Sequence, residues 1–224
     1  MHKENILKRL RTLRKPITVE KFIEICLYGE GGYYKDSNII GSVGDFITAP
    51  EISQLFGEIL GIYILNYWQN NINKKFNFVE LGPGKGTLLL DIIRITKSFD
   101  AFNKAINIKL IEKNKKLIDV QKNNFSKFNI NINQISWLHD FKDFNKDPVI
   151  VIANEFLDCF PIRQFYKKNY MNYEKMVQYD TTNEKLKFVD KEIKNHNILK
   201  NIQPYKHLDV IEISKSRENY FSKV

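Results

Sequence analysis

The stretch FVELGPGKGT at residues 78–87 decides the fold of this chain. An apolar strand pattern runs into a turn with three glycines, and a helical pattern begins directly after the turn. Glycine lets a backbone approach a ligand closely, and the amides at a helix start favour an anionic group. The spacing E-x-G-x-G-x-G differs from the dinucleotide fingerprint, which needs a glycine at the position where this chain has Thr87. It also differs from the P-loop, which needs Ser or Thr at the position where this chain has Gly86.

Strand and helix patterns alternate on the C-terminal side of this turn. The sequence predicts strands at 76–81, 106–112, 134–138 and 149–153, and helices at 86–96 and 114–125. The last of these strands is an almost unbroken apolar run, as expected of a strand covered on both faces. This order predicts an α/β fold with a doubly wound parallel sheet, whose ligands bind beyond the carboxyl ends of the strands.

Polar side chains follow three of the predicted strands. Glu112 ends the second strand, where a carboxylate can receive hydrogen bonds from ribose hydroxyls. His139 and Asp140 follow the third strand, and Asp140 can accept a hydrogen bond from an adenine amino group. The plainer interpretation is a solvated surface acid for Glu112 and a packed or solvent-facing residue for His139. The sequence NEFLD at 154–158 follows the fourth strand, and two carboxylates directly after a buried strand are hard to explain structurally.

The residues before the glycine turn predict helices joined by one long loop. Apolar spacing indicates short amphipathic helices near 6–13 and 18–27, and residues 29–48 contain five glycines and paired tyrosines, typical of a functional loop. The sequence TAPE at 48–51 matches a capping box. Apolar residues at helical intervals then predict one buried stripe. They are Ile52, Leu55, Phe56, Ile59, Leu60, Tyr63, Ile64 and Tyr67.

The C-terminal third predicts antiparallel strands. Aromatic and Val-rich segments lie at 164–166, 175–179 and 186–189, with turn residues at 180–184. A further strand is expected at 208–213 and a helix from about 214. We therefore expect four segments: a helical and loop cap at 1–73, a ligand-binding core at 74–161, an antiparallel insertion at 162–207, and the start of the second half of the core at 208–224.

Composition narrows the class of protein. The 224 residues are 43% hydrophobic and 27% charged, which is typical of a soluble globular domain and excludes a disulfide scaffold or a disordered tail. No apolar run approaches the roughly 18 residues that cross a bilayer. The two cysteines fit no metal or redox motif, so we expect no metal site and a reducing compartment. The net charge of +9 comes mostly from lysine, which favours a solvated surface over a nucleic-acid site.

The basic N-terminus admits two interpretations. An organelle-targeting presequence is amphipathic, Arg-rich and poor in acids. Glu4 and the scarcity of Ser argue against it, so a short amphipathic helix of the mature protein is the simpler interpretation.

Several motifs together resemble a known family. The glycine turn with its preceding acid resembles motif I of S-adenosylmethionine-dependent methyltransferases. The sequence GDFITAPEISQLFGE at 44–58 closely resembles the signature of the MidA family, the mitochondrial complex I assembly-factor methyltransferases and their bacterial relatives. Residues 16–19, 32–34 and 154–165 are similar to further family motifs, in the same order. The chain departs from the family at Asn172, usually Trp, at Lys175, usually Arg, and at Cys159-Phe160, commonly Ala-Leu.

The resemblance implies a class I methyltransferase with a Rossmann-like sheet that modifies a protein arginine, in the mitochondrial case on a core subunit of the respiratory NADH dehydrogenase. S-adenosylmethionine is the implied cofactor. The implied cofactor-binding residues are Glu80, Gly82, Gly84, Gly86, Glu112, His139, Asp140 and Asn154. The implied substrate or cap residues are Tyr33, Tyr34, Asp45, Phe46, Thr48, Glu51 and Gln54.

The carboxylates after the fourth strand suit an arginine acceptor. A guanidinium has a pKa above about 12 and therefore stays protonated at neutral pH, so its nitrogens are poor nucleophiles. A carboxylate that grips it bidentately can orient one nitrogen and take up the released proton. We expect Glu155 to have this role, together with Asp158. The Asn-Pro-Pro-Tyr type motif used on adenine or glutamine amides is absent, because Glu155 and Phe156 occupy its place.

Family members continue well past Val224, so we expect a C-terminally truncated chain with an incomplete sheet. Three hypotheses follow: an enzyme, a half protein completed by a second chain, and a non-catalytic remnant or cofactor-binding assembly factor. The expected partner is a protein substrate such as a respiratory subunit, with no nucleic acid and no membrane insertion. The expected location is the bacterial cytoplasm, with the mitochondrial matrix as the alternative.

Overall fold

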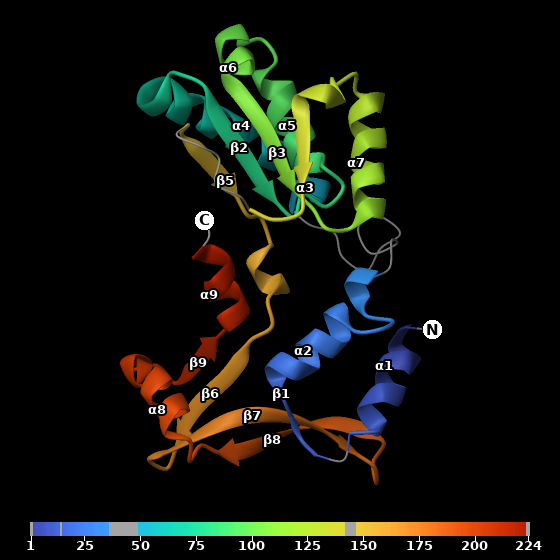
Figure 1. Cartoon of the computed structure of the whole chain (residues 1–224), viewed down its shortest axis with the longest axis vertical. Coiled ribbons are helices and arrows are strands. Elements are labelled where there is room, and N and C mark those ends of the chain that lie inside the picture. Colours follow the sequence, from blue (N-terminus) through green and yellow to red (C-terminus); the bar gives the residue numbers. More distant parts are fainter. Residues whose placement is uncertain (1, 14, 36–48, 142–146, 223–224) are drawn as a thin grey trace. The chain divides into compact units, whose positions relative to one another are not determined.

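The computed structural model describes residues 2–13, 15–35, 49–141 and 147–222, and these residues form two compact units. The first unit combines the described residues of 1–35 with 158–222, and the second consists of the described residues of 49–157. Figure 1 shows a parallel sheet in the second unit and an antiparallel sheet in the first. The fold class predicted from the sequence, an α/β protein with both kinds of sheet, is confirmed.

The second unit is built on a four-stranded parallel sheet with the order β4-β3-β2-β5. Its strands are β2 (Phe76–Leu81), β3 (Ile106–Ile111), β4 (Ile135–Leu138) and β5 (Val149–Ile152). The chain runs outward from β2 through β3 to β4 and then returns to the opposite side of β2 as β5. This reversal makes β2 and β5 the topological switch point, where ligands of open α/β sheets bind.

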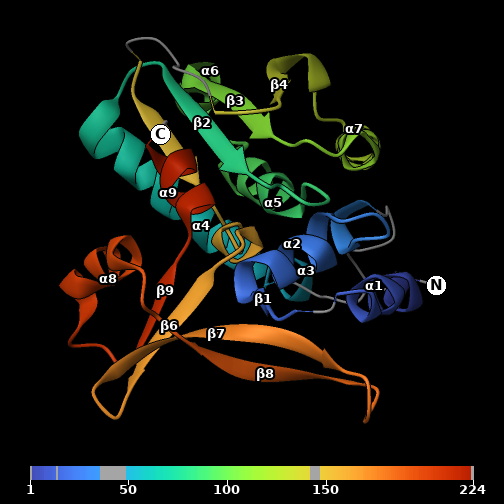
Figure 2. The same ribbon diagram turned by 60° about the horizontal axis from the view of Figure 1, so that its bottom comes forward.

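One face of the parallel sheet packs against helices. Alternate strand residues, among them Phe78 and Leu110, form a core with Leu89 and Ile92 of α5 (Thr87–Thr96) and Phe125 of α7 (Lys115–Lys127). The unit also contains α3 (Ala49–Ile52), α4 (Gln54–Tyr67), the π-helix η2 (Trp68–Ile72), α6 (Asp100–Ala105) and the 3-10 turn η3 (Ile132–Gln134). Figures 1 and 2 show α4 and α5 side by side on the same side of the sheet.

Helix α4 approaches α5 through two glycines, and this overturns the buried stripe predicted for it. A Cβ atom on Gly57 would lie 2.5 Å from Cβ of Asp91, and one on Gly61 would lie 2.6 Å from Cγ2 of Ile95. The close contact therefore uses the glycine face of α4. Most of the predicted stripe is exposed instead: Ile52, Leu55, Phe56, Ile59, Tyr63 and Tyr67. Only Ile64 of that stripe reaches the fully buried core.

The first unit is an antiparallel sheet with helices. Its strands are β1 (Ile17–Thr18), β6 (Arg163–Lys168), β7 (Met171–Asp180), β8 (Lys185–Glu192) and β9 (Val210–Ile213). Strand β7 pairs with β8 along one edge and with β6 and β1 along the other. The helices are α1 (His2–Arg11), α2 (Val19–Tyr28), α8 (His196–Ile202) and α9 (Lys215–Phe221), with the 3-10 turns η1 (Tyr33–Lys35) and η5 (Gln203–Tyr205). A further 3-10 turn, η4 (Leu157–Cys159), contains residues of both units.

The two units divide the chain differently from the four segments expected from the sequence. Strand β9 was expected to begin the second half of the parallel core, but it pairs with β6 in the antiparallel sheet, with Ile211 opposite Phe165. Those two residues form a small core with Ile202 of α8, which explains why β9 belongs there. Strand β1 near the N-terminus also joins this sheet, because Ile17 pairs with Val177 of β7.

Candidate functional site at the ends of the parallel strands

The three glycines after β2 all adopt left-handed backbone conformations. The φ angles are 65° at Gly82, 56° at Gly84 and 80° at Gly86, a region that residues with a Cβ seldom occupy. The amide of Gly82 donates to the carbonyl of Ile111 at 3.0 Å, and the amide of Gly86 donates to the carbonyl of Pro83 at 2.8 Å. These bonds hold a tight turn between β2 and the start of α5.

Two of these glycines are also packed against aromatic rings. A Cβ atom on Gly86 would lie 2.6 Å from Cζ of Phe125, and one on Gly82 would lie 2.8 Å from Cδ2 of Phe156. Phe125 belongs to α7, whereas Phe156 follows β5. The turn therefore needs glycine both for its backbone angles and for its close neighbours.

A hydrogen-bonded glutamine links this turn to the next strands. The side chain of Gln121, which is fully buried, donates to the carbonyl of Gly84 at 2.8 Å and accepts from the indole of Trp137 at 2.8 Å. Asn124, one helical turn further, donates to the carbonyl of Lys85 at 3.1 Å. Neither residue is predicted from the sequence, because nothing in their spacing distinguishes them from the other polar residues of α7.

Glu80 is a buried carboxylic acid two residues before Gly82. Only 3% of the residue is exposed, and among the residues that the structure describes none donates a hydrogen bond to its Oε2 atom. Burial raises the pKa of Glu80 to about 8. An unsatisfied carboxyl oxygen in the interior costs free energy. Its presence two residues before the turn therefore indicates that a bound ligand donates a hydrogen bond to it.

Glu112 lies at the end of β3, where the sequence placed it. Its Oε1 accepts from the amide of Asn114 at 2.8 Å, and its own amide donates to the carbonyl of Leu138 at 3.0 Å. Burial raises the pKa of the Glu112 carboxyl, against the opposing effect of the backbone amides of Asn114 and Lys113. The ends of β3 and β4 are thereby joined next to this acid.

The two predicted residues after β4 are exposed. Asp140 Oδ1 lies 3.2 Å from Nζ of Lys113, and more than half of each side chain is exposed, so this ion pair contributes little to stability. His139 is also exposed. Asp140 and Glu112 nevertheless follow neighbouring strands of one parallel sheet.

The residues after β5 show one unusual backbone conformation. Glu155 has a φ angle of 50°, in the left-handed region that costs a residue with a side chain about 1 kcal/mol or more. Its side chain is exposed, and Asn154 beside it is half-buried. The boundary between the two units falls between Leu157 and Asp158, so the two predicted catalytic carboxylates belong to different units.

The predicted substrate and cap residues fall into three groups. Asp45, Phe46 and Thr48 lie outside the described residues. Glu51 of α3 has its Oε1 atom 3.5 Å from Nζ of Lys85 in the glycine turn. Gln54 donates to Oε1 of Glu58 at 2.6 Å, so this side chain is engaged within α4.

Tyr33 and Tyr34, the third group, belong to an aromatic cluster of the first unit. The hydroxyl of Tyr34 lies 2.9 Å from Sγ of Cys159, and its ring stacks on that of Tyr28 at a centroid distance of 5.6 Å. Tyr28 donates its hydroxyl to the carbonyl of Cys159 at 2.5 Å. Burial raises the pKa of both Tyr28 and Tyr34. Tyr28, which no sequence motif indicates, thus holds the backbone of Cys159.

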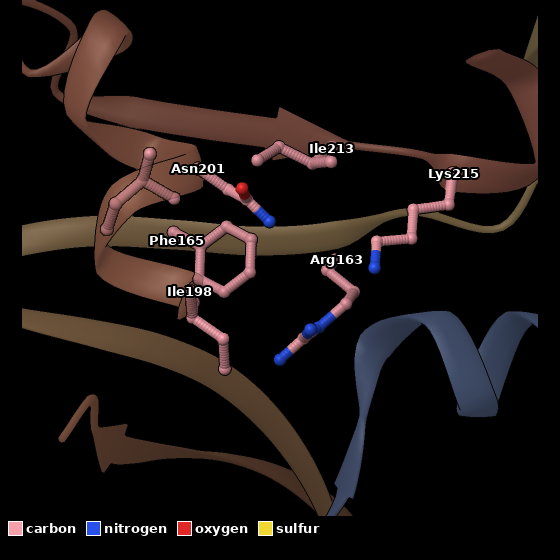
Figure 3. Close-up of a pocket in the computed structure, with 7 residues that line it drawn as sticks. Arg163, Phe165, Ile198, Asn201, Ile213 and Lys215 are labelled. Carbon is pink, nitrogen blue, oxygen red and sulfur yellow. The ribbon is translucent and has the colours of Figure 1, made fainter. Parts of the chain in front are cut away.

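A small hollow in the first unit is a separate feature. Figure 3 shows Arg163 and Phe165 of β6 with Lys215 of α9 and Asn201 of α8 around it. Arg163 donates two hydrogen bonds of 2.7 Å to the carboxylate of Glu174, so its charge is already neutralised. The volume of about 20 Å³ accommodates a water molecule and is far too small for a nucleoside.

The described residues contain neither a cluster of three or more potential metal ligands nor a helix of the length and apolarity that a membrane span requires.

Residues 59–224 match a protein family described as "Putative S-adenosyl-L-methionine-dependent methyltransferase". The chain belongs to this methyltransferase family. Its cofactor, S-adenosylmethionine, and the family suggested by the sequence motifs are thereby confirmed.

Curated relatives of this methyltransferase-family chain are named "Protein arginine methyltransferase NDUFAF7, mitochondrial". The relative from Bos taurus is 35% identical over 196 residues, which cover 78% of this chain and 44% of the relative. The human protein is 34% identical over the same share of each chain. The chain thus spans a little under half the length of these relatives.

A solved structure shares the fold. A protein from Burkholderia thailandensis, described as a "likely methyl transferase" and bound to S-adenosyl-homocysteine, has a TM-score of 0.74 and 20% identity. The match covers 96% of this chain and 57% of that one. At this identity the likeness concerns the fold alone.

The residues present fit the family's cofactor. The glycine turn would admit the methionine end against the backbone, and the α5 amides favour its carboxylate. The unsatisfied oxygen of Glu80 and the carboxylate of Glu112 are acceptors for ammonium and hydroxyl groups.

Proposed function

We propose that this chain binds S-adenosylmethionine at the carboxyl ends of β2, β3, β4 and β5 and methylates an arginine of a protein. The observation that carries this proposal is the left-handed glycine turn at the switch point of the sheet, next to a buried acid with an unsatisfied oxygen. The names of the relatives support arginine as the acceptor.

In this proposal each strand end has one task. Glu80, Gly82, Gly84 and Gly86 hold the methionine end, Glu112 receives the ribose hydroxyls, and Asp140 with His139 borders the adenine. Asn154 supports the position of the reacting centre. The cofactor, when bound, supplies an electrophilic methyl group on a sulfonium sulfur. The protein residues have to hold the acceptor nitrogen roughly 3 to 3.5 Å from that methyl group, in line with the breaking bond.

Glu155 orients the guanidinium and takes up its proton. A bidentate carboxylate favours one orientation of the planar guanidinium and leaves one nitrogen pointing away from it. When that nitrogen gains a methyl group, the guanidinium gives up one proton, and the Glu155 carboxylate takes it from one of the two nitrogens that it contacts. The strained φ of 50° at Glu155 supports this role, because strained backbone conformations cluster at functional sites.

The proposed acceptor protein follows from the resemblance to the MidA family, which favours a subunit of the respiratory NADH dehydrogenase. The mitochondrial relatives favour the mitochondrial matrix over a bacterial cytoplasm as the place of action. Exposed apolar side chains on α4 and the outer edge of β5 favour coverage by further polypeptide. We propose that polypeptide corresponding to the remaining sequence of the longer relatives covers these side chains.

Calorimetry with S-adenosyl-homocysteine, followed by methylation of arginine peptides, tests this function. We expect micromolar binding, and turnover that falls by about 100-fold or more in Glu155→Gln. Glu184→Gln is the matched control, because Glu184 is also exposed with a φ of 50° but lies in the β7–β8 turn.

Binding without turnover would instead support a non-catalytic assembly factor. If the nucleoside did not bind at all, the proposal of a cofactor-binding chain would be wrong.

A further inference from the structure

We propose that Glu51 and Lys85 together recognise the amino-acid end of the cofactor, with Glu51 as the ligand of its ammonium group. The inference deepens the proposed function and rests on it, because it concerns the same cofactor. It assigns a role in cofactor binding to a residue of α3, which precedes the parallel sheet in the chain.

The position of the pair places it at the glycine turn. Lys85 stands between Gly84 and Gly86, and its Nζ atom is 3.5 Å from Oε1 of Glu51. That separation is an ion-pair distance but is too long for a strong hydrogen bond. The side chain of Lys85 is 30% exposed and that of Glu51 is 12% exposed, so the pair is largely buried but still accessible from solvent.

The second carboxylate oxygen of Glu51 is the feature that points to a ligand. Within the described part of the chain, Oε2 of Glu51 is buried and accepts no hydrogen bond. Oε2 of Glu80, two residues before the turn, is in the same condition. Leaving a buried carboxyl oxygen unsatisfied costs about 1–3 kcal/mol. One of these two acids precedes the glycine turn by two residues, and the other lies at ion-pair distance from a lysine within it. A donor group with positive charge would satisfy this site.

The amino-acid end of the cofactor offers two opposite charges. Its carboxylate suits the amides at the start of α5 and the ammonium of Lys85. Its own ammonium carries three donors and needs acceptors, which the carboxylate of Glu51 supplies. A lysine and a glutamate at ion-pair distance are thus complementary to a zwitterion, with each side chain facing the opposite charge.

Glu51 is better suited than Glu80 to supply the negative charge. Burial raises the pKa of Glu80 to about 8, so that side chain is mostly neutral at pH 7. A neutral carboxyl accepts a hydrogen bond but does not balance a charge. Glu51 therefore provides the charge, and Glu80 provides an additional acceptor.

Three nucleosides distinguish the groups that each residue contacts. S-adenosyl-homocysteine has both charges, S-adenosyl-3-thiopropylamine lacks the carboxylate, and 5′-methylthioadenosine lacks both. By calorimetry we expect Glu51→Gln to bind the first two about tenfold more weakly or worse, and the third unchanged. We expect Lys85→Gln to weaken only S-adenosyl-homocysteine. Glu184→Gln is the control, and it should bind all three as the unaltered chain does.

Unchanged binding of the third nucleoside shows that each variant is folded, and Glu51→Asp replaces Glu51→Gln if the latter does not fold. Equal weakening of all three nucleosides, or none, would overturn the inference while the cofactor site itself stands. If Glu51→Gln weakened the binding of an arginine peptide but of none of the nucleosides, the inference would also be wrong, and Glu51 would belong to the site of the methyl acceptor. Failure of the unaltered chain to bind any of them would contradict the proposed function as well.

Discussion

Glu80 combines burial, an unsatisfied oxygen and a pKa raised to about 8, whereas a carboxyl of this kind ordinarily titrates near 4.5. Between these two pH values the Glu80 carboxyl is protonated in the folded chain and ionised in the unfolded chain. The unfolded state then binds fewer protons, so the free energy of unfolding falls as the pH rises. The residue therefore acts against stability at neutral pH, which is expected where burial serves binding.

Replacing Glu80 by Gln should remove most of this pH dependence. Gln cannot ionise, so we expect the variant to be more stable than the unaltered chain by about 2–4 kcal/mol at pH 8 and nearly equal to it at pH 4. Denaturant unfolding at several pH values without ligand measures the difference. Glu184→Gln, at an exposed site, should leave the pH profile unchanged. Parallel profiles for the Glu80 variant and the unaltered chain would contradict the raised pKa.

At the scale of single residues, the sequence revealed the three glycines and the acids after each strand, because chemistry at a strand end follows from the order of the elements. It did not reveal Gln121 or Tyr28. Gln121 acts through a carbonyl of the glycine turn, and Tyr28 through a carbonyl of residue 159. Every residue has a backbone carbonyl, so the sequence does not show which carbonyl accepts a hydrogen bond from a given side chain. Such contacts can be identified only in a structure.

The element with the largest difference from expectation is α4. Apolar residues at helical intervals predicted that its apolar face is buried, but the glycine face packs against α5 instead. Periodicity cannot tell which face of a helix meets a neighbour when the helix is apolar on most sides. The exposed positions include Ile62 at 53% and Tyr63 at 66%, which leaves an apolar surface beside the parallel sheet.

Gly61→Ala tests the packing of α4 on α5. The added Cβ would lie 2.6 Å from Cγ2 of Ile95 and 3.1 Å from Cα of Ile92. Alanine favours a helix by about 1 kcal/mol over glycine, but overpacking outweighs this gain, so we expect a net loss of about 1–3 kcal/mol in denaturant unfolding.

Two further variants examine the cause of that loss. Ile95→Ala removes the Cγ2 atom, so combining it with Gly61→Ala should cost less than the sum of the two single changes. Ile62→Ala, on the exposed face, should change stability by less than about 1 kcal/mol. A stabilised Gly61→Ala variant would show that the two helices are further apart than described.

At the scale of the whole molecule, the two units combine segments that are distant in the chain. The N-terminal residues join a sheet whose other strands follow residue 162, through a strand of only two residues, Ile17 and Thr18. So short a strand has no detectable pattern, and its partner is about 160 positions away. The sequence therefore predicted the kinds of sheet correctly, but it could not predict which segments join them.

Hydrogen exchange with and without S-adenosyl-homocysteine should show this division. The glycine turn, α5 and the ends of β3 and β4 belong to the second unit, so we expect the ligand to slow exchange of amides in residues 82–90 and 112–114. Amides of the β7–β8 hairpin in the first unit should exchange at unchanged rates. Equal slowing in both units would contradict a site confined to the parallel strands.

The hydrogen bond between Trp137 and Gln121 has a spectroscopic consequence. The chain has two tryptophans, and the indole of Trp137 is connected through one glutamine amide to the carbonyl of Gly84 in the glycine turn. Trp68 donates instead to the carbonyl of Lys74, which precedes β2, whereas the glycine turn follows that strand. We therefore expect intrinsic fluorescence to contain one component that follows occupancy of the turn and one that stays constant, so that ligand titration needs no added dye.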